Sequence, residues 1–142
     1  MSQKRMVHSN IWESSQYTKV CRDARLLFIG TITIADDDGR LKGNPALLKS
    51  KIFPYDEDIK IADVKEWLES LISIGLLEQY IVDEELYLLH PNWNKYQILR
   101  SDRKKESFIP APPNWVRPED EIVLPNNPNI NRKLAIAVYE IG

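Results

Sequence analysis

The chain has 142 residues, 43% of them hydrophobic and 28% charged, so it is long enough for one domain with its own core and too short for two. Its single cysteine excludes an internal disulfide framework and a cysteine-based zinc site. No stretch approaches the roughly 18 apolar residues that a membrane span needs, so we expect a soluble, cytoplasmic protein without a membrane partner.

The formal net charge of −2 hides an uneven distribution of charge along the chain. Residues 1–35 carry five basic and two acidic side chains, whereas residues 36–90 carry thirteen acidic and six basic ones. Residues 91–105 are basic again, with five basic side chains against Asp102. Two basic ends around an acidic middle are compatible with a nucleic-acid partner, despite the negative total.

The first long apolar segment, RDARLLFIGTITIA (22–35), is expected to form a helix. Residues such as Ala24, Leu27 and Phe28 can cover one broad apolar face, with the charges gathered at its start. The β-branched second half leaves a strand possible there. The following DDDGR favours a turn, because Gly39 can take a positive φ.

Two further helices are expected after this turn. Asn44 as the cap and Pro45 at the first helical position predict a short helix over residues 45–53. The spacing of apolar residues over 60–75 predicts a third, stronger helix that ends at Gly75.

The runs LLEQYIV (76–82) and LYLLH (86–90) predict an antiparallel hairpin with a three-residue connection, residues 83–85. Helix, short extended piece, helix, helix and hairpin is the order of a winged helix-turn-helix. The sequence therefore predicts an α+β winged-helix domain over residues 1–99, with three helices and a β-hairpin wing. Six of the nine prolines fall beyond residue 105, so residues 100–142 are expected to form a basic arm and an extended, proline-rich C-terminal segment.

The segments ARLLFIG, ADDDGR, NPALLKSKIFPYDEDI and YLLHPNWNKYQ occur in this order. They resemble blocks in the N-terminal winged-helix domain of phage replisome-organiser proteins, which are related to DnaD-type primosomal proteins. The resemblance covers about residues 3–97. It implies a DNA-binding domain that helps to start replication at a phage origin, in the host cytoplasm, and that in some relatives recruits a helicase loader.

The chain departs from this family at three places. Relatives often carry glycine and lysines in the wing, whereas this chain has Asp83, Glu84 and Glu85, which would repel phosphate. Relatives usually have Ser or Thr where Cys21 and Lys60 precede the first and third helices, so two preferred helix caps are missing.

In a winged helix the third helix normally enters the major groove, and the wing and flanking arms contact the DNA backbone. The candidate contacts to double-stranded DNA are therefore the lysines of the second and third helices and the basic residues after the hairpin: Lys49, Lys51, Lys60, Lys65, Lys95, Arg100, Arg103, Lys104 and Lys105. The basic pair Lys4 and Arg5 could act similarly.

The third helix also carries Asp63, Glu66 and Glu69 at successive i+3 positions. Such an acidic stripe is unfavourable beside phosphates, so two other interpretations stay open for this helix. Its outer face is either an ordinary solvated surface or a surface that binds a basic protein partner.

Between the hairpin and the basic arm lies HPNWNKYQ (90–97). Pro91 is expected to end the second strand, and Trp93 to seal the edge of the core with its indole N–H at the rim. We expect Tyr96 to pack in the core, with stacking on a sugar or base as the alternative. No special charge role is predicted for His90.

The sequence gives little support for catalysis. It has no G-x-S-x-G, P-loop or H-E-x-x-H motif, and the acidic clusters at 36–38 and 56–58 lack the spacing of a calcium loop. Turn and cap chemistry explains these acids, so we expect no enzymatic activity, cofactor or metal.

Two hypotheses follow. The protein is either a DNA-binding protein of phage-type replication initiation, with a homodimer on repeated sites as one form, or a protein-interaction module that binds a replication or assembly partner. A transcriptional regulator with the same fold is a third hypothesis.

Overall fold

The computed structural model describes residues 4–97 and 107–113. Within these residues the elements are two 3-10 helices, four α-helices and three strands: η1 Ser9–Glu13, η2 Tyr17–Lys19, α1 Arg22–Ile34, β1 Arg40–Lys42, α2 Pro45–Ile52, α3 Ile61–Ser73, β2 Glu78–Val82, β3 Glu85–Leu89 and α4 Trp93–Tyr96. The predicted order of helix, extended piece, helix, helix and hairpin is confirmed. The 3-10 helices and the short α4 were not predicted.

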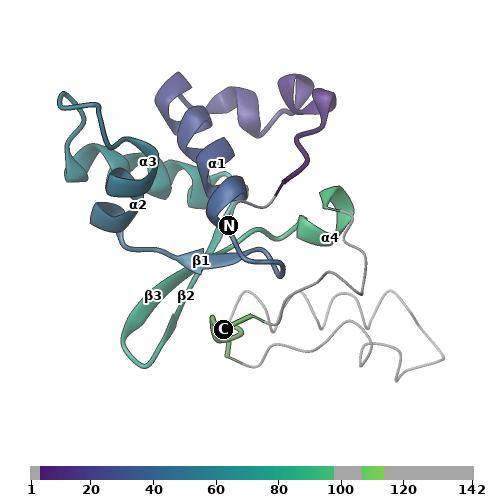
Figure 1. Cartoon of the computed structure of the whole chain (residues 1–142). Coiled ribbons are helices and arrows are strands. Elements are labelled where there is room, and N and C mark those ends of the chain that lie inside the picture. The colour runs from purple at the N-terminus through teal and green to yellow at the C-terminus, as the bar shows by residue number, and fades with distance from the viewer. Residues whose placement is uncertain (1–3, 98–106, 114–142) are drawn as a thin grey trace.

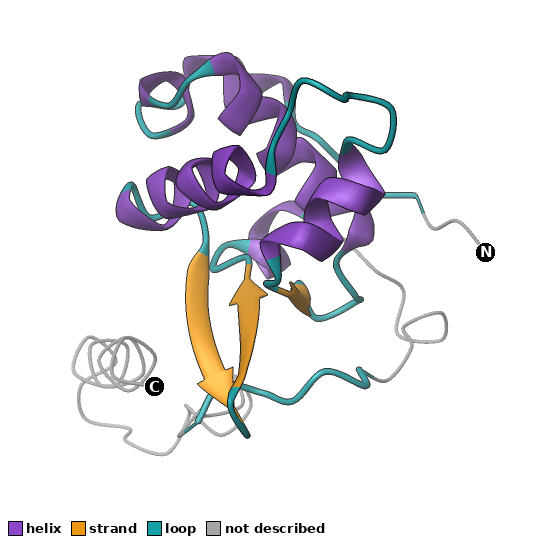
Figure 2. Cartoon of the chain, turned by 90° about the vertical axis from the view of Figure 1, so that its left-hand side faces the viewer, coloured by secondary structure: helices purple, strands orange, loops and turns teal. Residues whose placement is uncertain are grey.

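The helices gather in one layer, and the β2–β3 hairpin extends away from them (Figures 1 and 2). This is an α+β arrangement with a small antiparallel sheet, compatible with a wing-like hairpin. Helices α1 and α2 both pack against α3, and α1 also contacts α2. None of the described helices is long and apolar enough to cross a membrane.

Helix α1 forms as predicted, because its apolar face meets the core. Ala24 and Leu27 are completely buried there, together with Thr31. The helix ends where the chain turns at Asp36, whose carboxylate accepts hydrogen bonds from the amides of Asp38 and Arg40. The strand alternative for this segment is therefore wrong, since burial on one helical face outweighs the weak preference of β-branched residues.

Gly39 is required in this turn for two reasons. Its φ of +77° lies in the left-handed region, and a Cβ atom there would lie 2.6 Å from Cγ of Trp93. The predicted positive φ is confirmed, and it also allows the turn to pack tightly on the Trp93 ring.

The two remaining long helices begin with different caps. The Asn44 side chain accepts hydrogen bonds from the amides of Ala46 and Leu47, and Pro45 takes the first helical position, as predicted. At α3 the backbone amide of Lys60 donates to the Asp63 carboxylate over 2.9 Å. Asp63 therefore supplies part of the stabilisation that a Ser or Thr cap would give.

The sheet has the strand order β1-β3-β2, with both pairs antiparallel. Val82 pairs with Glu85, so the hairpin connection has two residues and not the predicted three. Asp83 (φ 51°) and Glu84 (φ 68°) both have positive φ, as a type I′ turn requires. A turn of this type matches the right-handed twist of the strands. The sequence did not predict it, because neither residue is glycine or asparagine.

Both faces of the sheet are apolar. Leu41, Leu77 and Leu88 join the main core under the helices, whereas Tyr80, Tyr87 and Leu89 form a second buried cluster on the opposite face. The rings of Tyr80 and Tyr87 stack with their centroids 5.5 Å apart. The second cluster explains why β3 has consecutive apolar residues, since a strand that is buried on both faces need not alternate apolar and polar residues.

Residues 107–113 cover this second face. Ile109 packs against the tyrosine cluster, and Pro112 is buried. The Tyr80 hydroxyl donates to the Pro110 carbonyl over 2.7 Å, and Arg40 Nη1 donates to the Ile109 carbonyl over 3.3 Å. Burial raises the pKa of Tyr80, so its hydroxyl stays protonated as a donor. Part of the proline-rich extension therefore folds back on the sheet, which the sequence left open.

Candidate nucleic-acid interface

The predicted lysine contacts fall on two helices that pack against each other. Lys49 and Lys51 occupy the last turn of α2, where Lys51 is exposed and Lys49 half-buried. Lys60 precedes α3 and Lys65 lies in its second turn, and both are exposed. These four residues therefore belong to one continuous segment, made of α2, the loop that follows it and α3, and the two helices lie close together in Figure 1.

The acidic stripe of α3 is shorter than the sequence suggested. Glu66 and Glu69 are exposed, but Asp63 is half-buried and bonded to the Lys60 amide. Lys65 lies four residues before Glu69, a spacing at which side chains on a helix are neighbours. The outer face of α3 is thus a mixed surface with one lysine and two glutamates.

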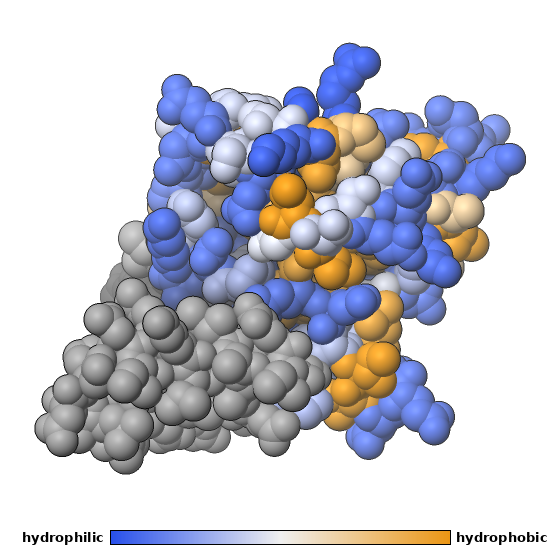
Figure 3. Space-filling model, turned by 180° about the vertical axis from the view of Figure 1, so that it is seen from behind, coloured by the Kyte–Doolittle hydropathy of each residue, from blue (hydrophilic) through white to orange (hydrophobic). Residues whose placement is uncertain are grey.

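The hairpin tip is acidic and exposed. Asp83, Glu84 and Glu85 are all exposed there, and the Tyr87 hydroxyl donates to the Glu85 carboxylate over 2.6 Å. This hydrogen bond is the main cause of the raised pKa of Tyr87. Hydrophobic side chains gather on the protruding hairpin beside these charges, and Ile81 is 60% exposed (Figure 3). This tip would repel a phosphate backbone.

Arg5 does not belong to a DNA-binding arm, and the expectation that the Lys4–Arg5 pair contacts DNA is wrong for Arg5. Its Nη2 lies 2.9 Å from Oδ1 of Asp37 and donates to the Ala35 carbonyl over 3.1 Å. The two charged side chains are 3% and 2% exposed, and the guanidinium lies 5.1 Å from the centre of the Trp93 ring. Arg5 instead fastens the N-terminal segment to the turn after α1.

The basic residues after the hairpin divide into two groups. Lys95 is exposed on α4, with Nζ 5.3 Å from the centre of the Tyr96 ring. Arg100, Arg103, Lys104 and Lys105 lie outside the described residues. Their role in DNA binding remains a prediction.

His90 and Trp93 lie deeper than expected. Trp93 is 5% exposed, and its indole N–H donates to the Asp37 carbonyl over 2.9 Å, so it lies in the core and not at the rim. The His90 ring packs between Phe28 and Trp93, and its Nε2 lies 3.0 Å from the Thr31 hydroxyl. Burial lowers the pKa of His90 to about 4, so the ring is neutral at pH 7.

The acidic clusters act in turns, as predicted for 36–38. Asp36 closes the turn after α1 and also accepts from the Ser107 hydroxyl, whereas residues 56–58 form an exposed loop. Within residues 4–97 and 107–113 no group of acids, histidines or cysteines has the arrangement of a metal site. Cys21 is exposed at the N-cap of α1, without a side-chain cap hydrogen bond.

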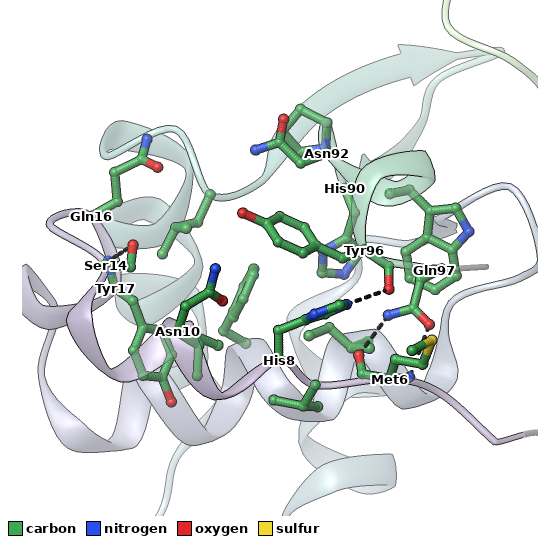
Figure 4. A pocket seen from close by; sticks show the side chains of 17 residues that line it. Met6, His8, Asn10, Ser14, Gln16, Tyr17, His90, Asn92, Tyr96 and Gln97 are labelled. Carbon is green, nitrogen blue, oxygen red and sulfur yellow. Dashed lines mark hydrogen bonds between the residues drawn. The ribbon is translucent and has the colours of Figure 1, made fainter.

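Sequence reasoning missed the residues of the N-terminal segment. Tyr17 is 2% exposed, and burial raises the pKa of its hydroxyl, with Arg25 acting in the opposite direction. His8 Nε2 lies 2.9 Å from the Tyr96 carbonyl. The segment encloses a cavity of about 120 Å³ against α1 and α4 (Figure 4). The contact between His8 and Tyr96 joins residues 88 positions apart, and a periodic sequence pattern cannot predict such a pair.

No family model, curated protein or solved structure matches this chain.

Proposed function

We propose that the protein is a winged-helix DNA-binding protein that acts in phage-type replication initiation. The observation that carries the proposal is the connectivity α1-β1-α2-α3-β2-β3 with the strand order β1-β3-β2. This order of elements supports the proposal, because it is the order of a helix-turn-helix that is followed by a β-hairpin wing. The replication role rests on the resemblance of the sequence blocks to replisome organisers.

Charge and exposure indicate which residues of this surface would contact the DNA. Lys51 and Lys65 are the exposed basic groups within α2 and α3, and Lys60 lies at the entry to α3. The acidic hairpin tip should stay away from the duplex, so the backbone contact that a wing usually makes is assigned to Lys95 and the basic residues 100–105. Sequence-independent affinity would come from these groups, through release of counterions.

The experiment compares two double variants with the same change in net charge. Lys51→Glu with Lys65→Glu should lower duplex affinity by about tenfold or more at low salt, because two phosphate contacts become repulsive. The control, Lys19→Glu with Arg22→Glu, reverses two exposed charges outside α2 and α3 and should change affinity much less. Equal losses for the two variants would exclude the helix–turn–helix surface as the interface.

A second function is favoured by the exposed acids Glu66 and Glu69. In this alternative the same surface binds a basic protein partner in an assembly, or the chain regulates transcription on the same fold. Capture of a defined replication protein that is lost in Glu66→Lys with Glu69→Lys, in a chain without duplex affinity, would support the protein-binding role. Unchanged capture would exclude it.

A further inference from the structure

Strand β2 forms one edge of the sheet, because the strand order is β1-β3-β2. It pairs with β3 along its inner side, and no further strand of the described residues pairs with its outer side (Figure 2). An edge strand presents unpaired N–H and C=O groups, to which another extended chain can bond. Many proteins block such an edge with proline or a bulge, whereas β2 has the sequence EQYIV and pairs with β3 without a break in register.

The register shows which backbone groups lie on the outer edge. Val82 and Glu85 flank a two-residue turn, so their backbone groups bond to each other. Bonded and non-bonded pairs alternate in an antiparallel ladder, so Ile81 and its partner Leu86 direct their backbone groups away from each other. The Gly43 amide donates to the Leu86 carbonyl over 2.9 Å from the far side, which agrees with this orientation. The N–H and C=O of Ile81 therefore point to the outer edge of β2.

Gln79 lies two positions earlier and has the same backbone orientation. Within residues 4–97 and 107–113 no hydrogen bond reaches the backbone groups of Gln79 or Ile81. Both side chains are exposed, and Ile81 lies opposite the half-buried Leu86, where hydrophobic side chains gather on the hairpin (Figure 3). An added strand would therefore bond to both residues and place an apolar side chain against Ile81.

The charge around this edge indicates which kind of chain can add to it. Residues 78–85 contain no basic side chain and four acidic ones: Glu78, Asp83, Glu84 and Glu85. All but Glu78 are exposed. A second copy of the chain is disfavoured, because antiparallel pairing of Gln79 with Ile81 would bring Glu78 of each copy beside the acidic turn of the other. A strand with basic side chains has the complementary charge.

We propose that the outer edge of β2 binds an extended, basic peptide segment of a partner protein, which adds to the sheet as a fourth strand. Its backbone bonds to Gln79 and Ile81, one of its apolar side chains packs against Ile81, and its lysine or arginine side chains lie near the acidic turn. The proposal gives a role to the acids of a hairpin that would repel phosphate. It goes beyond the DNA-binding function proposed above and does not depend on it.

The experiment titrates the full chain against a fluorescein-labelled heptapeptide of alternating lysine and valine, followed by fluorescence anisotropy. The control peptide has the same sequence with N-methyl groups on its valines, so it keeps the charge and loses the N–H donors of one edge. The unmodified peptide should bind about tenfold more tightly, because the donors that pair with β2 are lost in the control. Equal affinity for the two peptides, or no binding of either, would overturn the proposal.

Two variants and a control test the site. Ile81→Pro removes an N–H that faces away from β3, a place where a strand tolerates proline, and should lower peptide affinity about tenfold. Asp83→Asn with Glu84→Gly removes two charges, keeps a preferred type I′ turn and should lower affinity about fivefold. Asp56→Asn with Glu57→Gln removes two exposed acids of the loop before α3 and should change affinity much less. Unchanged affinity in either folded hairpin variant would contradict the site.

Sedimentation equilibrium without peptide tests the other occupant of the edge. The oligomeric state should be the same for the wild type and Ile81→Pro. A dimer that Ile81→Pro dissociates would assign the edge to a second copy of the chain and overturn the proposal. A duplex titration separates this proposal from the DNA-binding function, because Ile81→Pro should not weaken duplex binding and Lys51→Glu with Lys65→Glu should.

Discussion

The buried histidine makes the stability of the protein depend on pH in a predictable way. His90 is neutral in the folded state because burial lowers its pKa from 6.5 to about 4. In the unfolded chain it takes up a proton as the pH falls through 6.5, whereas the folded protein does so only near pH 4. Protonation therefore favours unfolding, and the stability that is present above pH 6.5 is lost between pH 6.5 and 4.

The size of the loss follows from the pKa difference. About 2.5 pKa units at 1.36 kcal/mol each give about 3 kcal/mol in total, of which about 2 kcal/mol is lost by pH 5. The control is His90→Gln, which keeps an N–H donor for Thr31 but does not titrate. Urea unfolding followed by tryptophan fluorescence should show a wild-type advantage that shrinks by about 2 kcal/mol between pH 7 and pH 5. A difference between the two proteins that stays constant with pH would refute this reasoning.

Three further predictions concern the contacts that hold the chain ends and the first turn. Arg5→Met should lower the free energy of unfolding by about 2 kcal/mol, because the buried Asp37 carboxylate loses the Arg5 guanidinium as one of its partners, and adding Asp37→Asn should restore part of it; a double variant less stable than Arg5→Met would contradict this. Tyr80→Phe should cost about 1 kcal/mol through loss of its bond to the C-terminal segment, and unchanged urea unfolding would show that this contact contributes nothing. Gly39→Ala should cost more than about 1 kcal/mol in the same assay, because of the positive φ and the close approach of Trp93, and a neutral result would contradict the geometry of this turn.

Sequence patterns predicted the elements that depend on local chemistry. Helix α2 was placed within one residue because Asn44 and Pro45 specify its start, and Gly75 marked the end of α3. The predicted hairpin connection was one residue too long, because Glu84 has a positive φ at the position where a type I′ turn usually has glycine.

The parts that depend on distant contacts could not be predicted. Arg5 looked like a DNA-binding residue because its sequence neighbours are basic, but its partner lies 32 residues away at Asp37. Trp93 was expected to seal the edge of the core, and no special charge role was predicted for His90, whereas both form a buried cluster with α1 and the turn after it. The spacing of apolar residues shows which face of a helix or strand is apolar, but it does not identify the distant segment that packs on that face.

The central claim is that the chain binds duplex DNA through basic groups on α2, α3 and the arm that follows α4. It is tested most directly by titration of a duplex against the full chain at several salt concentrations. The arm should be altered by Arg103→Ala with Lys104→Ala and not by truncation, since residues 107–113 pack on the sheet. We expect affinity to fall with salt by about 0.9 log units per log unit of salt for each phosphate contact, and the slope to drop by about 2 in the variant. Duplex affinity no greater than that of serum albumin at low salt would contradict the claim.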